Sequence, residues 1–224
     1  MGLTHNRKAG ISVARLAALA DNIFAVAMTL LVLDLRIPTR DLIHSSPELA
    51  RALWALAPQF VTYLISFLTL GIFWVGQHAM LNVLHRGDRN LSWLSLAFLA
   101  AVSIVPFSTR ILAEFFTYRA AIVLYWINIL ILGSVLYCTW RYSHRAGLLS
   151  PEHTDELRFP IERRIISAQI FYALGASLCL IDNRLSIAVI FLVQLSFVLG
   201  FRLPIKHKPR TRELPGTFPP KGPS

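Results

Sequence analysis

Long apolar runs separated by short polar stretches dominate the pattern of this chain. Six runs approach or reach the roughly 20 residues that a helix needs to cross a lipid bilayer. They are Leu16–Leu35, Leu56–Met80, Leu91–Leu112, Ala120–Trp140, Ile165–Ile181 and Leu185–Leu203. Only Asp182–Arg184 separates the last two runs, which together are too long for one span, so we predict a tight helical hairpin there. The pattern predicts an all-α integral membrane protein with six transmembrane helices.

The composition strengthens this interpretation and limits what else the chain contains. Its 224 residues are 55% hydrophobic and only 15% charged, and the mean hydropathy is +0.55, which is too apolar for a soluble domain of this size. We therefore assign residues 1–203 to one transmembrane domain. The first run lacks the small-residue cleavage pattern of a signal peptide, so we expect its helix to be retained.

Residues 204–224 differ from the rest of the chain, because they are rich in Pro, Lys and Arg and poor in apolar side chains. This composition is typical of a disordered segment. Two interpretations stay open for this basic tail: contact with anionic lipid headgroups, or a solvated segment without a partner.

The net charge of +10 bears on topology rather than on nucleic acid, because the cations lie between the apolar runs. Loops that would lie on one side of the membrane carry 16 Lys and Arg, and loops on the other side carry 6. Since positive loops stay in the cytoplasm, we predict that both termini are cytoplasmic in a multi-pass protein of the inner (plasma) membrane. We expect no nucleic-acid partner.

The sequence contains no pattern typical of a metal site or an enzyme. Cys138 and Cys179 lie in separate apolar runs without metal-ligand spacing. The chain has no HExxH, no GxSxG and no intramembrane carboxylate pair on facing helices. We expect no metal, no cofactor and no enzymatic activity.

The first run carries the unusual chemistry, because charged side chains inside a membrane are costly and tend to mark function. Arg15, Asp21 and Asn22 lie in or next to this run. At about 100° per residue, one face of the helix collects a stripe of residues. The stripe consists of Arg15, Asn22, Val26, Thr29 and Leu33. Asp21 lies about 120° away, beside Ala18 and Ala25, and is expected to face a neighbouring helix.

The second run offers polar partners for Asp21, namely Trp74, Gln77 and His78. We predict that His78 is the partner. Two roles stay open for this contact: joining the helices, or acting directly in function. Arg15 can extend to the cytoplasmic headgroups instead of pairing inside the protein. The residue pattern of the stripe by itself is compatible with ordinary helix packing as well as with a pore.

Several segments are similar to one known family. These are Arg15 with Leu19-Ala20-Asp21 and Ala25, TLLVLDLRIP (29–38), SFLTLGIFWVGQH (66–78) and Val105-Pro106-Phe107. They resemble the lysosomal-type potassium channel family, the transmembrane protein 175 family, in its short prokaryotic branch with one six-helix repeat. The family has Phe-Ser where this chain has Leu19 and Ala20. The last three helices resemble the family only in layout.

The resemblance implies a homotetramer in the bilayer, with the first helix of each chain lining a central pore. Carried over, the aliphatic rings of the pore are Val26, Leu30 and Leu33, the threonine layer is Thr29, and Asn22 lies at the pore mouth. The implied function is a potassium-permeable cation channel with potassium as the permeating ion and a hydrophobic gate or filter. Selectivity over sodium is expected to be modest, because the TVGYG carbonyl filter is absent.

The resemblance also implies a structural or gating network of Arg15, Asp21, Trp74 and His78. The same residues support an alternative function, a proton-coupled secondary transporter that uses Asp21 and His78, since histidine titrates near neutral pH. The sequence lacks broken helices and an internal inverted repeat, and this weighs against a transporter.

Overall fold

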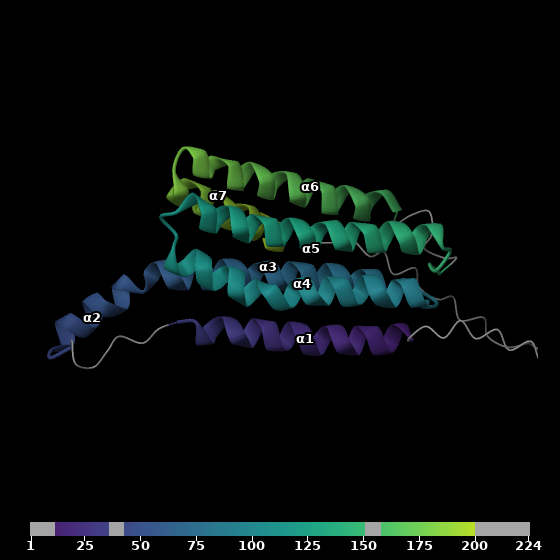
Figure 1. Ribbon diagram of the computed structural model, residues 1–224, viewed down its shortest axis with the longest axis horizontal. Helices are drawn as coiled ribbons and strands as arrows, with labels where there is room; N and C mark the ends of the chain where they lie inside the picture. The colour runs from purple at the N-terminus through teal and green to yellow at the C-terminus, as the bar shows by residue number, and fades with distance from the viewer. Residues whose placement is uncertain (1–11, 36–42, 151–157, 200–224) are drawn as a thin grey trace, which may run out of the picture.

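The described part of the protein is a bundle of roughly parallel and antiparallel helices. The computed structural model describes residues 12–35, 43–150 and 158–199, without the side chains of 158–160. The helices are α1 (Val13–Leu33), α2 (Ser46–Ala55), α3 (Ala57–Asn82), α4 (Arg89–Glu114), α5 (Arg119–Arg145), α6 (Arg158–Ser177), the 3-10 helix η3 (Leu178–Leu180) and α7 (Asn183–Leu199). Figure 1 shows α1 at one edge of the bundle, α6 at the opposite edge, and α2 projecting from one end. We call this end the α2 end.

Each predicted span coincides with a helix, although the bounds differ. Among the described residues, α1, α3, α4 and α5 are long and apolar enough to cross a membrane, and α7 is apolar but shorter, at 17 residues. Helix α6 begins before the predicted span, and residues 200–203 of the last predicted span lie outside the described ranges. Helix α2 is an additional element that the span search did not predict, because it is far shorter than a bilayer crossing.

Polar residues at the helix ends explain where the helices begin and stop. Ser12 caps α1, and Asp88 caps α4 by accepting a hydrogen bond from the Leu91 backbone N–H at 2.8 Å. Helix α5 ends before Gly147, whose φ of +61° suits glycine. The next residues form an isolated bridge between Leu149 and Leu84. This bridge ties the connection after α5 to the connection after α3.

Helix α4 occupies the middle of the bundle and packs against α1, α3 and α5. Aromatic rings fasten the edge helix to it: the Phe24 and Phe98 ring centroids are 6.1 Å apart, and those of Phe98 and Phe73 are 6.2 Å apart. All three rings are buried, and α1 contacts α3 and α4 but no other described helix.

A buried cluster of hydroxyl and amide groups joins the other helices. Ser66 donates to the Tyr125 hydroxyl at 3.2 Å, and Thr109 donates to Ser66 at 2.7 Å. The Gln194 side chain donates to Thr69 at 2.5 Å and so links α7 to α3. Interhelical hydrogen bonds matter in a membrane, because lipid tails are as apolar as the helix surfaces and burial alone does not drive packing.

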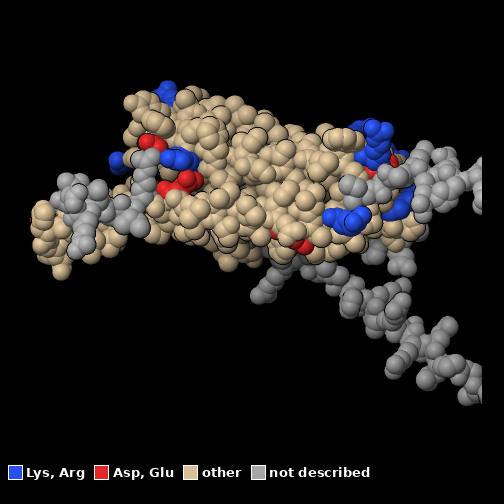
Figure 2. Space-filling model, turned by 60° about the horizontal axis from the view of Figure 1, so that its bottom comes forward, with Lys and Arg blue, Asp and Glu red and all other residues tan. Residues whose placement is uncertain are grey.

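The charged side chains separate toward the ends of the bundle. Figure 2 shows Lys and Arg gathered at the two ends of the visible face, with few charged residues between them. Figure 1 shows α7 directed back toward the end at which α1 begins. A charge-poor middle between two charged ends is the distribution expected of a multi-pass membrane protein.

Candidate functional site

Helix α1 has one face packed against the bundle and one face free. The packed face consists of Leu16, Ala20, Phe24, Ala27 and Leu31. On the other face, Val26 is 57% exposed and Leu33 is 75% exposed. This free face of α1 is largely apolar, so it requires either lipid or another chain against it.

The structure brings the residues of the predicted stripe onto this free face. All of them are exposed in the single chain: Arg15, Asn22, Val26, Thr29 and Leu33. Leu30 is 43% exposed and lies beside them. The helical periodicity read from the sequence therefore corresponds to a continuous unpacked face, which extends over the length of the helix.

Thr29 is the polar residue in the centre of the apolar part of this face. Its hydroxyl donates to the backbone oxygens of Ala25 at 3.0 Å and Val26 at 2.8 Å. The single hydroxyl hydrogen is therefore directed back into the helix. The lone pairs of the oxygen remain for a group in front of α1, and that group must be a donor or a cation.

Asp21 contacts α3 through Trp74. The indole Nε1–H donates to the Asp21 carboxylate at 2.8 Å, and the Trp74 and His78 rings lie 5.6 Å apart. Within the described residues, no hydrogen bond joins Asp21 to His78, so the prediction of His78 as the direct partner was wrong. The physical reason is that Trp74 lies one turn away from His78 on α3, and its indole fills the position next to the carboxylate.

The hollow between α1 and α3 at this place is tightly filled. It is lined by Ala17, Ala20, Asp21, Trp74, Gln77, His78 and Leu81, and it has no room for a water molecule. Arg15 is exposed in the first turn of α1, and its guanidinium has no hydrogen bond or ion pair within the described ranges. The structure thus brings together three of the four predicted network residues, Asp21, Trp74 and His78, and leaves Arg15 apart.

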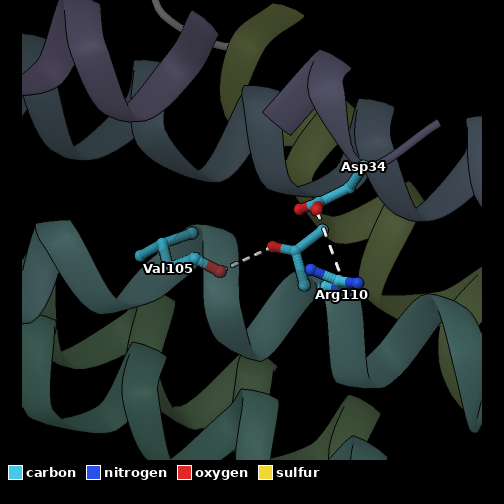
Figure 3. A network of polar contacts seen from close by, with 4 residues as sticks. Asp34, Val105 and Arg110 are labelled. Carbon is cyan, nitrogen blue, oxygen red and sulfur yellow. Dashed lines mark hydrogen bonds and ion pairs between the residues drawn. The ribbon is translucent and has the colours of Figure 1, made fainter. Parts of the chain in front are cut away.

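An ion pair that the sequence analysis did not identify lies at the other end of α1. Arg110 of α4 approaches Asp34, the residue that follows α1, with 3.9 Å between Nε and Oδ1. Figure 3 shows the two side chains directed toward each other. The pair is partly solvated, with Asp34 22% and Arg110 58% exposed. Opposite charges at the ends of the first and third apolar runs were the signal that could have revealed it.

The described part of the chain contains no group of three His, Cys, Asp or Glu side chains arranged to hold a metal ion. The polar groups on the free face of α1 are the Thr29 hydroxyl, the Asn22 amide and the Arg15 guanidinium in its first turn. These groups of a single helix can interact only weakly with a monovalent cation, and a stronger interaction requires several copies of α1 around the cation.

Comparisons with known proteins identify relatives. A family model described as endosomal/lysosomal potassium channel TMEM175 matches residues 15–106. A potassium channel of Streptomyces collinus is 31% identical over 179 residues, which cover 78% of this chain and 85% of that protein. A potassium channel of Chamaesiphon minutus is 28% identical over 189 residues, with 83% and 93% covered.

A solved structure and a human protein extend these findings. The crystal structure of a lysosomal potassium-selective channel TMEM175 homolog from Chamaesiphon minutus superposes with a TM-score of 0.72 at 26% identity, covering 85% of this chain and 98% of that chain. The endosomal/lysosomal proton channel TMEM175 of Homo sapiens is 31% identical over 101 residues, which are 43% of this chain and 20% of that protein.

Proposed function

The chain belongs to the TMEM175 potassium channel family, and on this premise we propose that four copies form a potassium-permeable cation channel. The family consists of ion channels and not of enzymes. The observation that carries the proposal is the free face of α1, which is apolar, continuous and interrupted by Thr29. Around a four-fold axis, this face lines the pore.

The residues of this face have separate roles in the proposed pore. Four Thr29 oxygens, with their hydrogens turned back into the helices, offer lone pairs to a partly dehydrated potassium ion. Rings of Val26, Leu30 and Leu33 form apolar constrictions that gate by excluding water. Asn22 lies at the mouth of the pore. Because hydroxyl groups replace a carbonyl filter, the preference for potassium over sodium is modest.

The contact of Asp21 with Trp74 sets the rotation of α1 in this proposal. The carboxylate is fixed to α3 by the indole N–H, and the free face therefore points away from α3 and α4. Arg15 acts with the headgroups or with a neighbouring copy. A change in the position of α3 would turn α1 and alter the width of the constriction.

We place the channel in the plasma membrane with both termini in the cytoplasm, following the 16 to 6 distribution of Lys and Arg. The direction of α7, back toward the end at which α1 begins, supports an even number of crossings (Figure 1). The proposed contact of the basic tail with anionic lipid concerns residues 204–224, which lie outside the described ranges.

The alternative, a proton-coupled transporter using Asp21 and His78, is less well supported by the geometry. Asp21 is bonded to the Trp74 indole and has no hydrogen bond to His78 among the described residues, and the hollow that both line has no room for a bridging water molecule. An indole N–H donates but does not accept a proton at neutral pH, so Trp74 cannot pass a proton between Asp21 and His78. Potassium flux that requires an opposing proton gradient would favour the transporter.

The experiment that tests the channel compares potassium and sodium flux through the purified protein in liposomes, for the wild type and Thr29→Ala. We expect passive flux in both, with a potassium-to-sodium ratio that falls severalfold in the variant. Thr139→Ala is the matched control, because this threonine also bonds its own helix backbone, at 2.7 Å, but lies on α5, which has no close contact with α1.

An unchanged ion ratio in Thr29→Ala contradicts the threonine layer. An equal fall in Thr139→Ala also contradicts it, since the effect would then arise from general loss of helix packing. Absence of passive cation flux in the wild type contradicts the channel itself.

A further inference from the structure

A pocket outside the proposed pore lies at the α2 end, between the connection of α4 to α5 and the turn of η3 to α7. It has a volume of about 300 Å³ and is lined by Phe116, Thr117, Arg119, Cys179, Ile181, Asp182, Asn183 and Arg184. Figure 1 places both connections at the same end of the bundle, on the side away from α1. Neither the channel proposal nor the predicted stripe assigns a role to this pocket.

Hydrogen bonds across the pocket hold its two walls together. The Arg119 guanidinium donates to the Leu180 backbone oxygen at 3.1 Å. From the opposite wall, the Asn183 amide donates to the backbone oxygens of Phe116 at 3.3 Å and Thr117 at 2.5 Å. These bonds connect residues more than 60 positions apart in the chain, so the pocket is a built feature and not a gap between two independent loops.

The pocket carries an excess of positive charge. Arg119 and Arg184 line it, and neither guanidinium has a carboxylate at ion-pair distance within the described residues. The only acidic residue in the lining is Asp182, which caps α7 through Oδ1 at 2.6 Å from the Arg184 N–H and 3.1 Å from the Leu185 N–H. Two arginines and one capping carboxylate thus line the pocket, and this excess of positive charge favours an anion.

The length of α5 is compatible with a pocket at the depth of the lipid headgroups. Helix α5 has 27 residues, which is about 40 Å at 1.5 Å per residue, close to the thickness of a bilayer with its headgroups. Arg119 is the first residue of this helix, so a helix that spans the bilayer and its headgroups would place Arg119 at the headgroup level. The neighbouring Tyr118 is 63% exposed, and exposed tyrosines are enriched at this interface.

Apolar side chains beside the pocket face outward. Ile181, which lines the pocket, is 76% exposed, and the preceding Leu180, the last residue of η3, is 68% exposed. A soluble anion has no apolar part that could pack against these side chains. A lipid, which joins an anionic phosphate to acyl chains, complements the arginines and the apolar rim together.

We propose that this pocket binds the phosphate group of a phospholipid, with Arg119 and Arg184 as its ligands and the acyl chains along Leu180 and Ile181. Guanidinium groups bind phosphate oxygens through paired charge-assisted hydrogen bonds, which suits this role. The bound lipid bridges the α4–α5 connection and the α6–α7 hairpin. The proposal concerns lipid binding and holds whether or not the chain conducts potassium.

The test measures lipid retained by the purified, delipidated full-length protein, using native mass spectrometry. Three probes are added separately: dioleoyl phosphatidylglycerol, dioleoylglycerol with the same acyl chains but no phosphate, and inorganic phosphate. The variants are Arg184→Gln and Arg119→Gln. Arg51→Gln on α2 is the matched control, because it removes the same charge at the same end from a residue that does not line the pocket.

We expect the wild type and Arg51→Gln to retain phosphatidylglycerol, and Arg184→Gln and Arg119→Gln to retain it with roughly tenfold lower affinity. Dioleoylglycerol should not be retained. The Arg184 side chain makes no hydrogen bond among the described residues, so its variant is expected to fold. The comparison of the two lipids needs only the wild type and stays decisive if a variant fails to fold.

Equal retention of phosphatidylglycerol by the wild type and both pocket variants would overturn the proposal, as would equal retention of dioleoylglycerol. Displacement of the lipid by millimolar inorganic phosphate would also overturn it, because the pocket would then be a site for a free anion.

Discussion

Asp21 shows that the sequence can predict the need for a hydrogen-bond partner, whereas the packing of the helices determines which residue is that partner. A carboxylate in the first apolar run predicts a partner on a neighbouring helix, because an unpaired charge in the membrane is costly. The structure supplies the indole N–H of Trp74 as that partner, and the centroid of the His78 ring lies 5.6 Å from that of the indole. The contact belongs to the α1–α3 interface.

The first prediction concerns this hydrogen bond. Trp74→Phe keeps an aromatic ring but removes the only side-chain donor that Asp21 has among the described residues. We expect the variant to lose about 1–2 kcal/mol of stability, or roughly 2–8 °C in Tm, measured by thermal unfolding in detergent. Trp54→Phe is the control, since Trp54 is 80% exposed on α2. An equal loss in both variants would show that ring size, and not the bond to Asp21, is responsible.

At the scale of helices, α1 differs from its neighbours in being held on one side only. Its packed face follows Leu16, Phe24 and Leu31 into α3 and α4, while the opposite face meets no other described element. Helices α3, α5 and α7 are instead joined through the buried hydroxyl cluster around Tyr125. The bundle therefore combines helices joined by buried hydrogen bonds with an edge helix, α1, whose outer face contacts no other described element.

Loss of an apolar ring on α1 should open the proposed constriction. Leu33→Ala removes a side chain that is 75% exposed on the free face, so we expect larger passive potassium flux in liposomes, with little change in thermal stability. Leu192→Ala on α7, where the side chain is 61% exposed, is the matched control and should leave flux unchanged. Unaltered flux in Leu33→Ala would remove this ring from the pore.

The hydroxyl cluster should contribute to helix packing without affecting ion preference. Tyr125→Phe removes the oxygen that bonds to Ser66 and Thr69, and we expect a loss of roughly 0.6–1.7 kcal/mol in unfolding free energy. Tyr118→Phe serves as the control, because Tyr118 is 63% exposed. A changed potassium-to-sodium ratio in Tyr125→Phe would place this cluster in the permeation path and contradict its scaffold role.

For the whole molecule, the distribution of charge and the free face of α1 together point to an assembly. Charges gather at the ends of the bundle, and the Asp34–Arg110 pair lies where α1 ends, next to the exposed Leu33 (Figures 2 and 3). In the proposed tetramer, four such pairs would lie at the end of the pore that Leu33 lines. Arg110 would then offset the attraction of Asp34 for cations.

Removal of the Arg110 charge should change potassium conductance in a way that depends on the salt concentration. We expect Arg110→Gln to raise potassium conductance in dilute salt and to lose this effect near 1 M salt, where screening acts within about 3 Å. The double variant Asp34→Asn with Arg110→Gln should return to wild-type conductance, and Arg51→Gln should show no rise. Planar bilayer recordings supply the measurement, and a rise that persists in the double variant would contradict the role of Asp34.

The sequence by itself determined the features that depend on order along the chain. The apolar runs predicted the positions of the long helices, and a 3.6-residue period predicted which α1 residues share a face. The short family motifs in the first three runs identified the TMEM175 family, which the comparisons confirm. These properties are local or nearly local, so no knowledge of the packing was needed.

Only the tertiary structure decided which side chains meet across helices. The choice of Trp74 over His78 for Asp21, the pairing of Asp34 with Arg110 and the pocket at Arg119 and Arg184 all join residues more than 50 positions apart. Their physical basis is the rotation and axial offset of one helix against another, which many small packing contacts set together. Periodicity defines the face of a helix, but the neighbouring helix selects the residue that makes the contact.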